Sequence, residues 1–328
     1  MTIDLRRQLP ILTLATVLVV GLFAPLALKL SAPGFWMEVL LGGLMAGVLY
    51  SLVALGFVLI FKASGVFNFA QGAMVLFAAL SVARLSEKMP LWVAILLAVV
   101  IMVLLAIVIE RLVLRPLVNQ PQITLFMATI GLTFVLEGLS QLLWGSQPHG
   151  LDLGIKDVPM EWLADSTGMF ISQFDLFASG IAAVLVATLS LFFQYTRIGR
   201  ALRAVADDHQ AAQAVGIPLK HIWAIVWAVA GFVALVAGLM WGARNGVQFA
   251  LTFIALKALP VLILGGFESV LGAIVGGLII GASEKLAEVY IGPMVGGGIE
   301  SWFAYVIALL FLLVRPQGLF GEKIIDRV

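Results

Sequence analysis

Four polar side chains stand inside otherwise apolar stretches of this sequence, where they could bind a polar molecule. Asn68 and Gln71, in "KASGVFNFAQG", are three residues apart, so in a helix they share a face and could hydrogen-bond a solute in transit. Glu137, in "TIGLTFVLEGLSQLLW", and Lys257, in "FIALKALPVLIL", are ionisable groups deep in apolar runs. A charge at the centre of a bilayer costs about 2.5–3.5 kcal/mol on insertion scales, so both residues are candidates for a solute pathway.

Structural alternatives stay open for these residues. Asn68 could simply cap a turn between two apolar segments. Lys257 could extend its ammonium group to the membrane surface on the outer side while its stem stays in lipid. Glu284 and Lys285 lie near the end of a later apolar run, and we expect both at the interface.

The sequence lacks the motifs of common catalytic centres. It contains no G-x-x-x-x-G-K-[ST] phosphate loop, no H-E-x-x-H zinc helix and no G-x-S-x-G nucleophile elbow. It has no cysteine, and its three histidines fall in loops or at segment ends. We therefore expect no catalytic residue, cofactor or metal in this chain, and no ATP hydrolysis of its own.

The elements that carry these residues are expected to be membrane helices. Of the 328 residues, 62% are hydrophobic and 11% are charged, about half the charged share of a soluble protein. Continuous apolar runs favour helices over barrel strands, which alternate with a period of two. We predict an all-α polytopic membrane protein that forms one transmembrane domain over residues 1–328. About ten transmembrane or partial segments are expected, at residues 9–29, 37–61, 69–84, 90–109, 122–144, 175–195, 221–243, 252–264, 270–288 and 300–315.

Two of these segments, 69–84 and 252–264, are short and could be partial spans. The first, 9–29, follows Arg6 and Arg7 and could be a signal peptide. Its apolar run is longer than a usual signal core and lacks a clear cleavage site, which favours a retained first helix.

The distribution of Lys and Arg predicts the orientation, since cytoplasmic loops carry the excess of these residues. With both termini cytoplasmic, the inside set is the larger one: Arg6, Arg7, Lys62, Arg111, Arg115, Arg197, Arg200, Arg203, Lys220, Arg315, Lys323 and Arg327. The long outside loop, about residues 145–174, is acidic. The scattered basic residues and the net charge of +1 give no sign of nucleic-acid binding.

One conspicuously charged island, "TRIGRALRAVADDHQAAQAVGIP", interrupts the apolar chain at residues 196–218, within a cytoplasmic region of about 196–220. It predicts two short helices. The first carries Arg197, Arg200 and Arg203 on neighbouring turns, and Arg203 could pair with Asp207. The second begins at Asp208 as N-cap and stops at Gly216, with Pro218 just beyond.

Two interpretations of this island remain. It could be an anchor that only fixes topology by its positive charge. Its length and its capped helices favour a docking surface for another protein instead, with the small apolar residues Ala211, Ala212, Ala214 and Val215 exposed for contact.

The chain resembles the permease subunits of branched-chain amino acid ABC transporters of the LivH type. Five motifs carry the resemblance in order: "GGLMAGVLYSLVALGFVLIFKASGVFNFAQGAMVLFAA" (42–79), "IERLVLRPL" (109–117), "TRIGRALRAVADDHQAAQAVGI" (196–217), "ALKALPVLILGGFESVLGAIVGGLIIGASEKL" (255–286) and "LLVRPQGLFG" (312–321). The resemblance implies a multi-pass protein of the bacterial inner membrane. It also implies a second related permease subunit, two cytoplasmic ATPases that carry ATP and Mg²⁺, and a periplasmic substrate-binding protein.

The resemblance further implies that the charged island receives the mechanical signal of ATP binding. A second candidate contact is "GGFES", with Gly265, Gly266, Glu268 and Ser269. The family usually has glycine at the position of Glu268, so whether Glu268 meets an ATPase or the lipid surface stays open.

Small residues in "LGAIVGGLIIGA" form two close-approach faces, Gly272 with Gly276 and Gly277 with Gly281. Their partner could lie within the chain or in a second subunit.

The resulting functional hypothesis is a subunit of a binding-protein-dependent importer of branched-chain amino acids. The same type of transporter for urea, short-chain amides or aromatic acids is an alternative, as is a stand-alone channel or facilitator.

Overall fold

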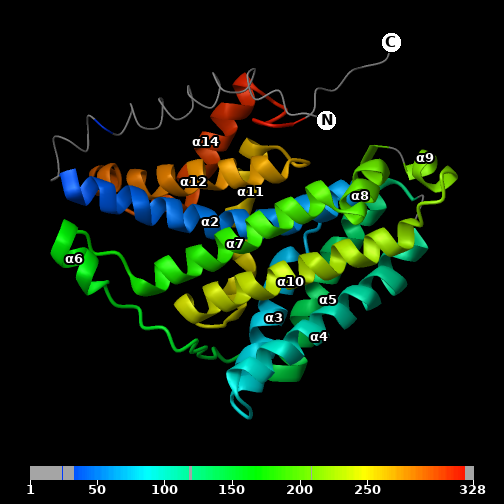
Figure 1. The fold of residues 1–328 in the computed structure, drawn as a ribbon, viewed down its shortest axis with the longest axis horizontal. Helices are drawn as coiled ribbons and strands as arrows, with labels where there is room; N and C mark the ends of the chain where they lie inside the picture. Colours follow the sequence, from blue (N-terminus) through cyan, green and yellow to red (C-terminus); the bar gives the residue numbers. More distant parts are fainter. Residues whose placement is uncertain (1–23, 25–32, 118–119, 208, 322–328) are drawn as a thin grey trace. The chain divides into compact units, whose positions relative to one another are not determined.

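The computed structural model describes residue 24 and residues 33–117, 120–207 and 209–321. Within these ranges the chain is helical (Figure 1), and its extended pairings are isolated bridges that join His149 to Val247 and Pro159 to Ser172. The predicted all-α class is confirmed. Apart from residue 24, the expected first segment, 9–29, lies outside the described residues, as do both chain ends.

Six helices of the described chain are long and apolar enough to cross a membrane, and each coincides with an expected segment. They are α2 (Pro33–Ser64), α4 (Leu91–Ile109) with its extensions η1 (Glu110–Leu114) and η2 (Arg115–Leu117), α5 (Gln122–Trp144), α7 (Gln173–Tyr195), α10 (Leu219–Asn245) and α12 (Val270–Tyr290).

Three further expected segments form shorter apolar helices: α3 (Gln71–Ser86), η3 (Phe249–Phe253) continued by α11 (Ile254–Gly265), and α14 (Glu300–Val314). At 1.5 Å per residue α3 reaches only about 24 Å, which is less than the hydrocarbon thickness of about 30 Å. The prediction that segments 69–84 and 252–264 are short is therefore confirmed. Four small helices complete the described chain: α6 (Glu161–Thr167), α8 (Arg197–Asp207), α9 (His209–Ala214) and α13 (Gly292–Val295).

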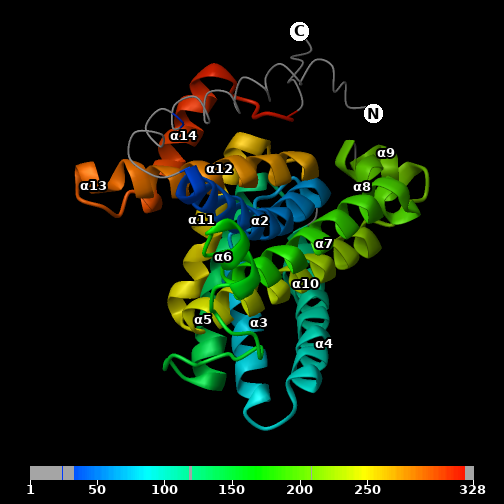
Figure 2. The same cartoon turned by 60° about the vertical axis from the view of Figure 1, so that its left-hand side comes forward.

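The described chain divides into two compact units, and α2, α7 and α11 contribute to both. The second unit, within residues 52–154 and 184–256, is built around α3. This helix is buried along most of its length and packs against α4, α5 and α10. Figure 2 shows α3 and α4 as a hairpin joined by a short loop. Gly238 lets α10 approach the backbone of Val75 closely, since a Cβ there would clash with the Val75 carbonyl.

The helices of the second unit alternate in direction, as the predicted order of segments requires. At one end, the indole Nε1 of Trp223 near the start of α10 donates to the carbonyl of Ala63 near the end of α2, at 3.0 Å. At the other end, His149 after α5 pairs with Val247 after α10.

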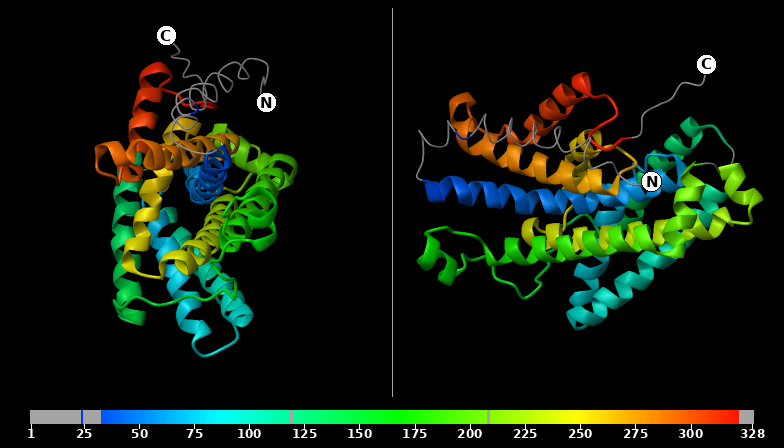
Figure 3. Two further views of the ribbon diagram at one scale, coloured as in Figure 1. Left: turned by 90° about the vertical axis from the view of Figure 1, so that its left-hand side faces the viewer. Right: turned by 45° about the horizontal axis from the view of Figure 1, so that its top comes forward.

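The first unit, within residues 1–51, 155–183 and 257–328, is built around α12. One face of α12 packs against α2, where a Cβ at Gly277 or Gly281 would collide with the backbone of Gly47. The other face packs against α11, where a Cβ at Gly272 or Gly276 would collide with backbone of that helix. Figure 3 shows α12 alongside α2. Both predicted glycine faces therefore find their partners within the chain.

Candidate functional site

The charged island folds into the two helices predicted from its sequence, α8 and α9. The Oγ1 of Thr196 accepts a hydrogen bond from the backbone N–H of Gly199 at 3.1 Å, which helps to start α8. Gly199 packs so tightly on Phe193 that a Cβ would collide with the Phe193 carbonyl. After α9 the chain turns at Gly216, whose φ of 85° favours glycine, and α10 begins after Pro218.

Two arginines attach α8 to the end of α7. Arg203 donates from Nη1 to the carbonyl of Phe193 at 2.7 Å and from Nη2 to the carbonyl of Gln194 at 3.2 Å. Arg200 donates to the carbonyl of Tyr195 at 3.3 Å. These carbonyls end a helix and lack intrahelical partners, so cationic donors satisfy them well. The side chain of Asp207, the expected partner of Arg203, and all of Asp208 lie outside the described residues.

The exposed surface of α8 and α9 differs in one residue from the sequence prediction. Ala211, Ala214 and Val215 are exposed, with Val215 at 76%. Ala212 is buried, contrary to the prediction, because this face of the short α9 packs inward. Arg197 is also exposed. The helix pair α8–α9 is therefore attached to the end of α7 and exposes both basic and apolar side chains.

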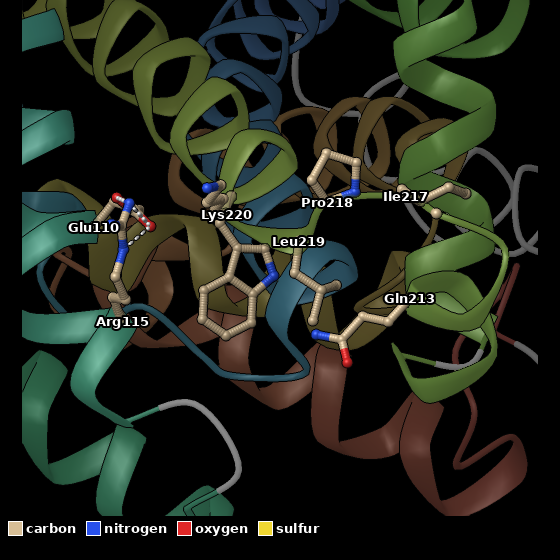
Figure 4. Close-up of a pocket in the computed structure, with 9 residues that line it drawn as sticks. Glu110, Arg115, Gln213, Ile217, Pro218, Leu219 and Lys220 are labelled. Carbon is tan, nitrogen blue, oxygen red and sulfur yellow. Dashed lines mark hydrogen bonds and ion pairs between the residues drawn. The ribbon is translucent and has the colours of Figure 1, made fainter.

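A cavity of about 410 Å³ lies between η1–η2 and the junction of α9 with α10 (Figure 4). Its wall includes Gln213, Leu219 and Lys220. On its other side Glu110 accepts from Arg115 at 2.9 Å, and the Glu110 side chain is only 3% exposed. Two motifs from distant parts of the sequence thus meet here, "IERLVLRPL" and the end of the charged island.

Sequence reasoning did not find this ion pair. The five-residue spacing of Glu110 and Arg115 does not match the i,i+4 pattern of an α-helix. It does match the π-helical turn of η1, whose wider coil brings residues five apart together. A buried acid at the end of an apolar run, followed by an arginine, is the signal that could have revealed it.

The second predicted contact, "GGFES", forms a tight turn between α11 and α12 in the first unit. Gly266 has a φ of 101° and is buried, whereas Glu268 is exposed. Ser269 caps α12, with its Oγ accepting from the N–H of Gly272 at 2.9 Å. The "PQGLFG" segment closes over this turn, because Leu319 N–H donates to Leu264 O at 2.7 Å and Phe320 N–H to Gly265 O at 3.1 Å.

The two amides of the predicted pathway lie together and are completely buried in the second unit. Asn68 donates from Nδ2 to Oε1 of Gln71 at 3.3 Å, and its Oδ1 accepts from the N–H of Ala70 at 3.1 Å. Asn68 therefore caps a turn and also shares a site with Gln71. The Gln71 amide lies against Gly56, where a Cβ would occupy its place. The Gln71 Nε2 has no hydrogen-bond partner among the described residues.

A row of aromatic rings flanks this amide pair. Phe57 stacks on Phe67 with ring centroids 4.7 Å apart, Phe67 meets Phe69 edge-on at 4.7 Å, and Phe69 meets Phe126 at 4.9 Å. Thr129 on α5 donates to the carbonyl of Phe67 at 3.1 Å. Polar donors and acceptors beside an aromatic wall suit a solute with a polar head and an apolar side chain.

The two ionisable pathway candidates have different surroundings. Lys257 belongs to the first unit, and its Nζ lies 2.5 Å from Oε1 of Glu284. Glu284 is 4% exposed, because α12 turns this carboxylate inward to a lysine 27 positions away in sequence. Glu137 is half-buried on α5, with no ion pair to any other described residue.

In the described part of the chain, no three His, Asp or Glu side chains gather where they could hold a metal ion. The groups that the structure does bring together are hydrogen-bonding and charged side chains within membrane helices. Such an arrangement suits the binding and passage of a solute.

Comparisons with known proteins agree on one family. The model of the family "Branched-chain amino acid transport system / permease component" matches residues 39–315. The high-affinity branched-chain amino acid transport system permease protein LivH of Salmonella typhimurium is 27% identical, over 90% of this chain and 98% of its own length. BraD of Pseudomonas aeruginosa is 27% identical over 89% and 98%, and a probable LivH of Methanocaldococcus jannaschii is 29% identical over 86% and 92%. The chain belongs to the family of permease components of branched-chain amino acid transport systems.

Proposed function

We propose that this chain is a membrane-spanning subunit of a binding-protein-dependent ABC importer of branched-chain amino acids in the bacterial inner membrane. Its helix pair α8–α9 is the surface that receives a cytoplasmic ATPase. One observation carries the proposal: Arg203 fixes α8 to the last carbonyls of α7, while Arg197 and Val215 stay exposed. An anchor that only set topology would not require this rigid attachment.

A displacement of the helix pair α8–α9 can be transmitted to the membrane helices through two connections. The first is α7, through the bonds from Arg203 and the close packing of Gly199 on Phe193. The second is α10, which begins four residues after Val215. Trp223 near the start of α10 donates to the carbonyl of Ala63. Ala63 lies five residues before Asn68, so a displacement of α8–α9 reaches the segment that carries the buried amides.

The proposed assembly contains three further kinds of subunit. A second permease completes the pathway, two ATPases supply ATP binding and hydrolysis with Mg²⁺, and a periplasmic binding protein delivers the solute. The exposed tip of "GGFES", Phe267 and Glu268, is proposed as a further ATPase contact. Movement of these contacts drives alternating access of a pathway between the membrane helices.

Co-purification tests the docking role. The unsubstituted chain and a variant that carries both Arg197→Glu and Arg200→Glu are tagged and purified from native membranes. The ATPase subunits that co-purify with each are quantified by mass spectrometry. The variant is expected to lose the ATPases at an unchanged level of permease. Lys88→Glu plus Lys156→Glu is the matched control, because it makes the same charge change at exposed positions of expected outside loops. ATPases retained by the Arg197→Glu plus Arg200→Glu variant would contradict the proposal and favour a stand-alone channel.

A further inference from the structure

Three side chains from three helices of the first unit form a charged cluster. Lys257 stands in the first turn of α11, Glu284 in α12 and Tyr50 in α2. The Glu284 Oε1 accepts from Lys257 Nζ at 2.5 Å and from the hydroxyl of Tyr50 at 3.2 Å. The ammonium also lies 5.9 Å from the centre of the Tyr50 ring.

This cluster is incomplete as a purely structural ion pair. The second carboxylate oxygen of Glu284, Oε2, is buried and has no hydrogen-bond partner among the described residues. A buried ion pair is stable only when its remaining lone pairs are also satisfied. Tyr50 and Glu284 are almost fully buried, whereas the Lys257 side chain is 28% exposed. The Lys257 ammonium also donates to the carbonyl of Glu300 at 3.5 Å, and it is the most exposed group of the cluster.

The charges of the cluster restrict what can open it. If Lys257 moves away to bind an anion alone, the Glu284 carboxylate is left buried without a counter-charge, which is strongly unfavourable. A neutral molecule cannot replace either charge. A zwitterion can replace both at once, because its carboxylate pairs with Lys257 and its ammonium pairs with Glu284.

We propose that Lys257, Glu284 and Tyr50 form a binding station for the charged head of a zwitterionic amino acid. The solute carboxylate takes the place of Glu284 at Lys257 Nζ. The solute ammonium donates to Glu284, whose Oε2 is free to accept it, and Tyr50 holds the other carboxylate oxygen in position. This inference rests on the proposed import function and specifies the substrate class: amino acids with both charges, in preference to urea, amides or simple carboxylic acids.

Uptake of radiolabelled leucine by cells that carry the transporter tests this station. The variants are Lys257→Met, Glu284→Gln and the double substitution Lys257→Met with Glu284→Met, all at membrane levels matched to the unsubstituted chain. All three are expected to lower uptake at least about tenfold. Each single substitution leaves one charge without its partner, and the double substitution restores neutral packing but not recognition of charge. Lys285→Met is the matched control, since it removes an exposed positive charge at the next position of α12 and is expected to leave uptake unchanged.

The double substitution separates recognition from structure. If the pair only holds α11 to α12, removing both charges relieves the buried unpaired group, and uptake returns to within about twofold of the unsubstituted chain. That result would overturn the inference and leave the import function intact. If the unsubstituted chain gives no leucine uptake above a deletion strain, the proposed function and the inference both fail.

Discussion

The guanidinium of Arg203 donates to the carbonyl of Phe193, ten residues earlier in the chain, and so joins the charged helix α8 to the end of the membrane helix α7. The sequence also suggested Asp207 on its own helix as a partner of this residue, and the Asp207 side chain lies outside the described residues. Arg203 therefore helps to fix the helix pair in place, while Arg197 is exposed.

Arg203→Ala is expected to loosen α8 from α7 while the exposed Arg197 and Val215 of the docking surface are kept. The substitution removes two hydrogen bonds from a charged donor, and such bonds contribute about 1.5–3 kcal/mol each. The rate of trypsin cleavage after Arg197 and Arg200 in the purified protein should rise several-fold, because local opening exposes this backbone.

Arg200→Ala is the matched variant for this test. Because it removes one of the two cleavage sites, the rate of trypsin cleavage after Arg197 is compared between the two variants. Its single bond to the carbonyl of Tyr195 is longer, at 3.3 Å, so its effect should be clearly smaller. Equal cleavage rates in both variants would show that Arg203 is not the principal attachment.

Gly277→Ala is expected to destabilise the first unit. A Cβ at this position would collide with the Ser51 hydroxyl and with the carbonyl of Gly47, both on α2. Overpacking of this kind typically costs about 1–3 kcal/mol. The melting temperature of the purified protein in detergent should fall accordingly.

Gly131→Ala on α5 provides the comparison, because nothing lies within 4 Å of a Cβ at Gly131. Alanine is favoured over glycine in a helix by up to about 1 kcal/mol, so this substitution should leave stability unchanged or raise it. A Gly277→Ala protein as stable as Gly131→Ala would contradict the close packing of α12 on α2.

Gln71→Leu distinguishes a solute contact from a structural amide. The Gln71 Nε2 is buried without a described partner, whereas its Oε1 accepts from Asn68 Nδ2 at 3.3 Å. Gln71→Leu therefore leaves one buried donor unpaired and should cost no more than about 1–3 kcal/mol of stability. Transport of leucine should nevertheless fall markedly if this amide contacts the passing solute. The measurements are uptake and melting temperature on the same variant.

Two outcomes of this experiment would contradict a pathway role for Gln71. Unchanged uptake would assign the amide to packing between α2 and α3. A large fall in melting temperature would show that the residue holds the turn at Asn68 together, and reduced uptake would then follow from misfolding.

The positions of the membrane helices could be predicted from the sequence because they depend on local composition. Long apolar runs bounded by Gly, Pro or charge produced nine of the expected segments within the described residues. The helix pair α8–α9 could be predicted for the same reason, since Gly216 and Pro218 are local stop signals.

The orientation of each helix about its own axis could not be predicted in this way. Where a run such as that of α4 is apolar on every side, its sequence does not indicate which face turns inward. The sequence also did not indicate that Glu284 faces Lys257, because this pairing depends on how α11 and α12 pack. The glycines of α12 did indicate close approach, but only the fold shows that Gly43 and Gly47 of α2 receive one face.

Photo-crosslinking from Val215 tests the central claim, that α8–α9 is the ATPase contact, most directly. The chain has no native cysteine, so Val215→Cys offers a unique thiol for a benzophenone label at a site that is 76% exposed. Met294→Cys, at a site that is 75% exposed on an expected outside segment, is the control. We predict that illumination of native membranes joins the Val215→Cys protein, and not the Met294→Cys protein, to an ATPase subunit. An ATPase adduct from position 294 but not from position 215, or a thiol at 215 that reacts only with reagents from outside the cell, would contradict this account.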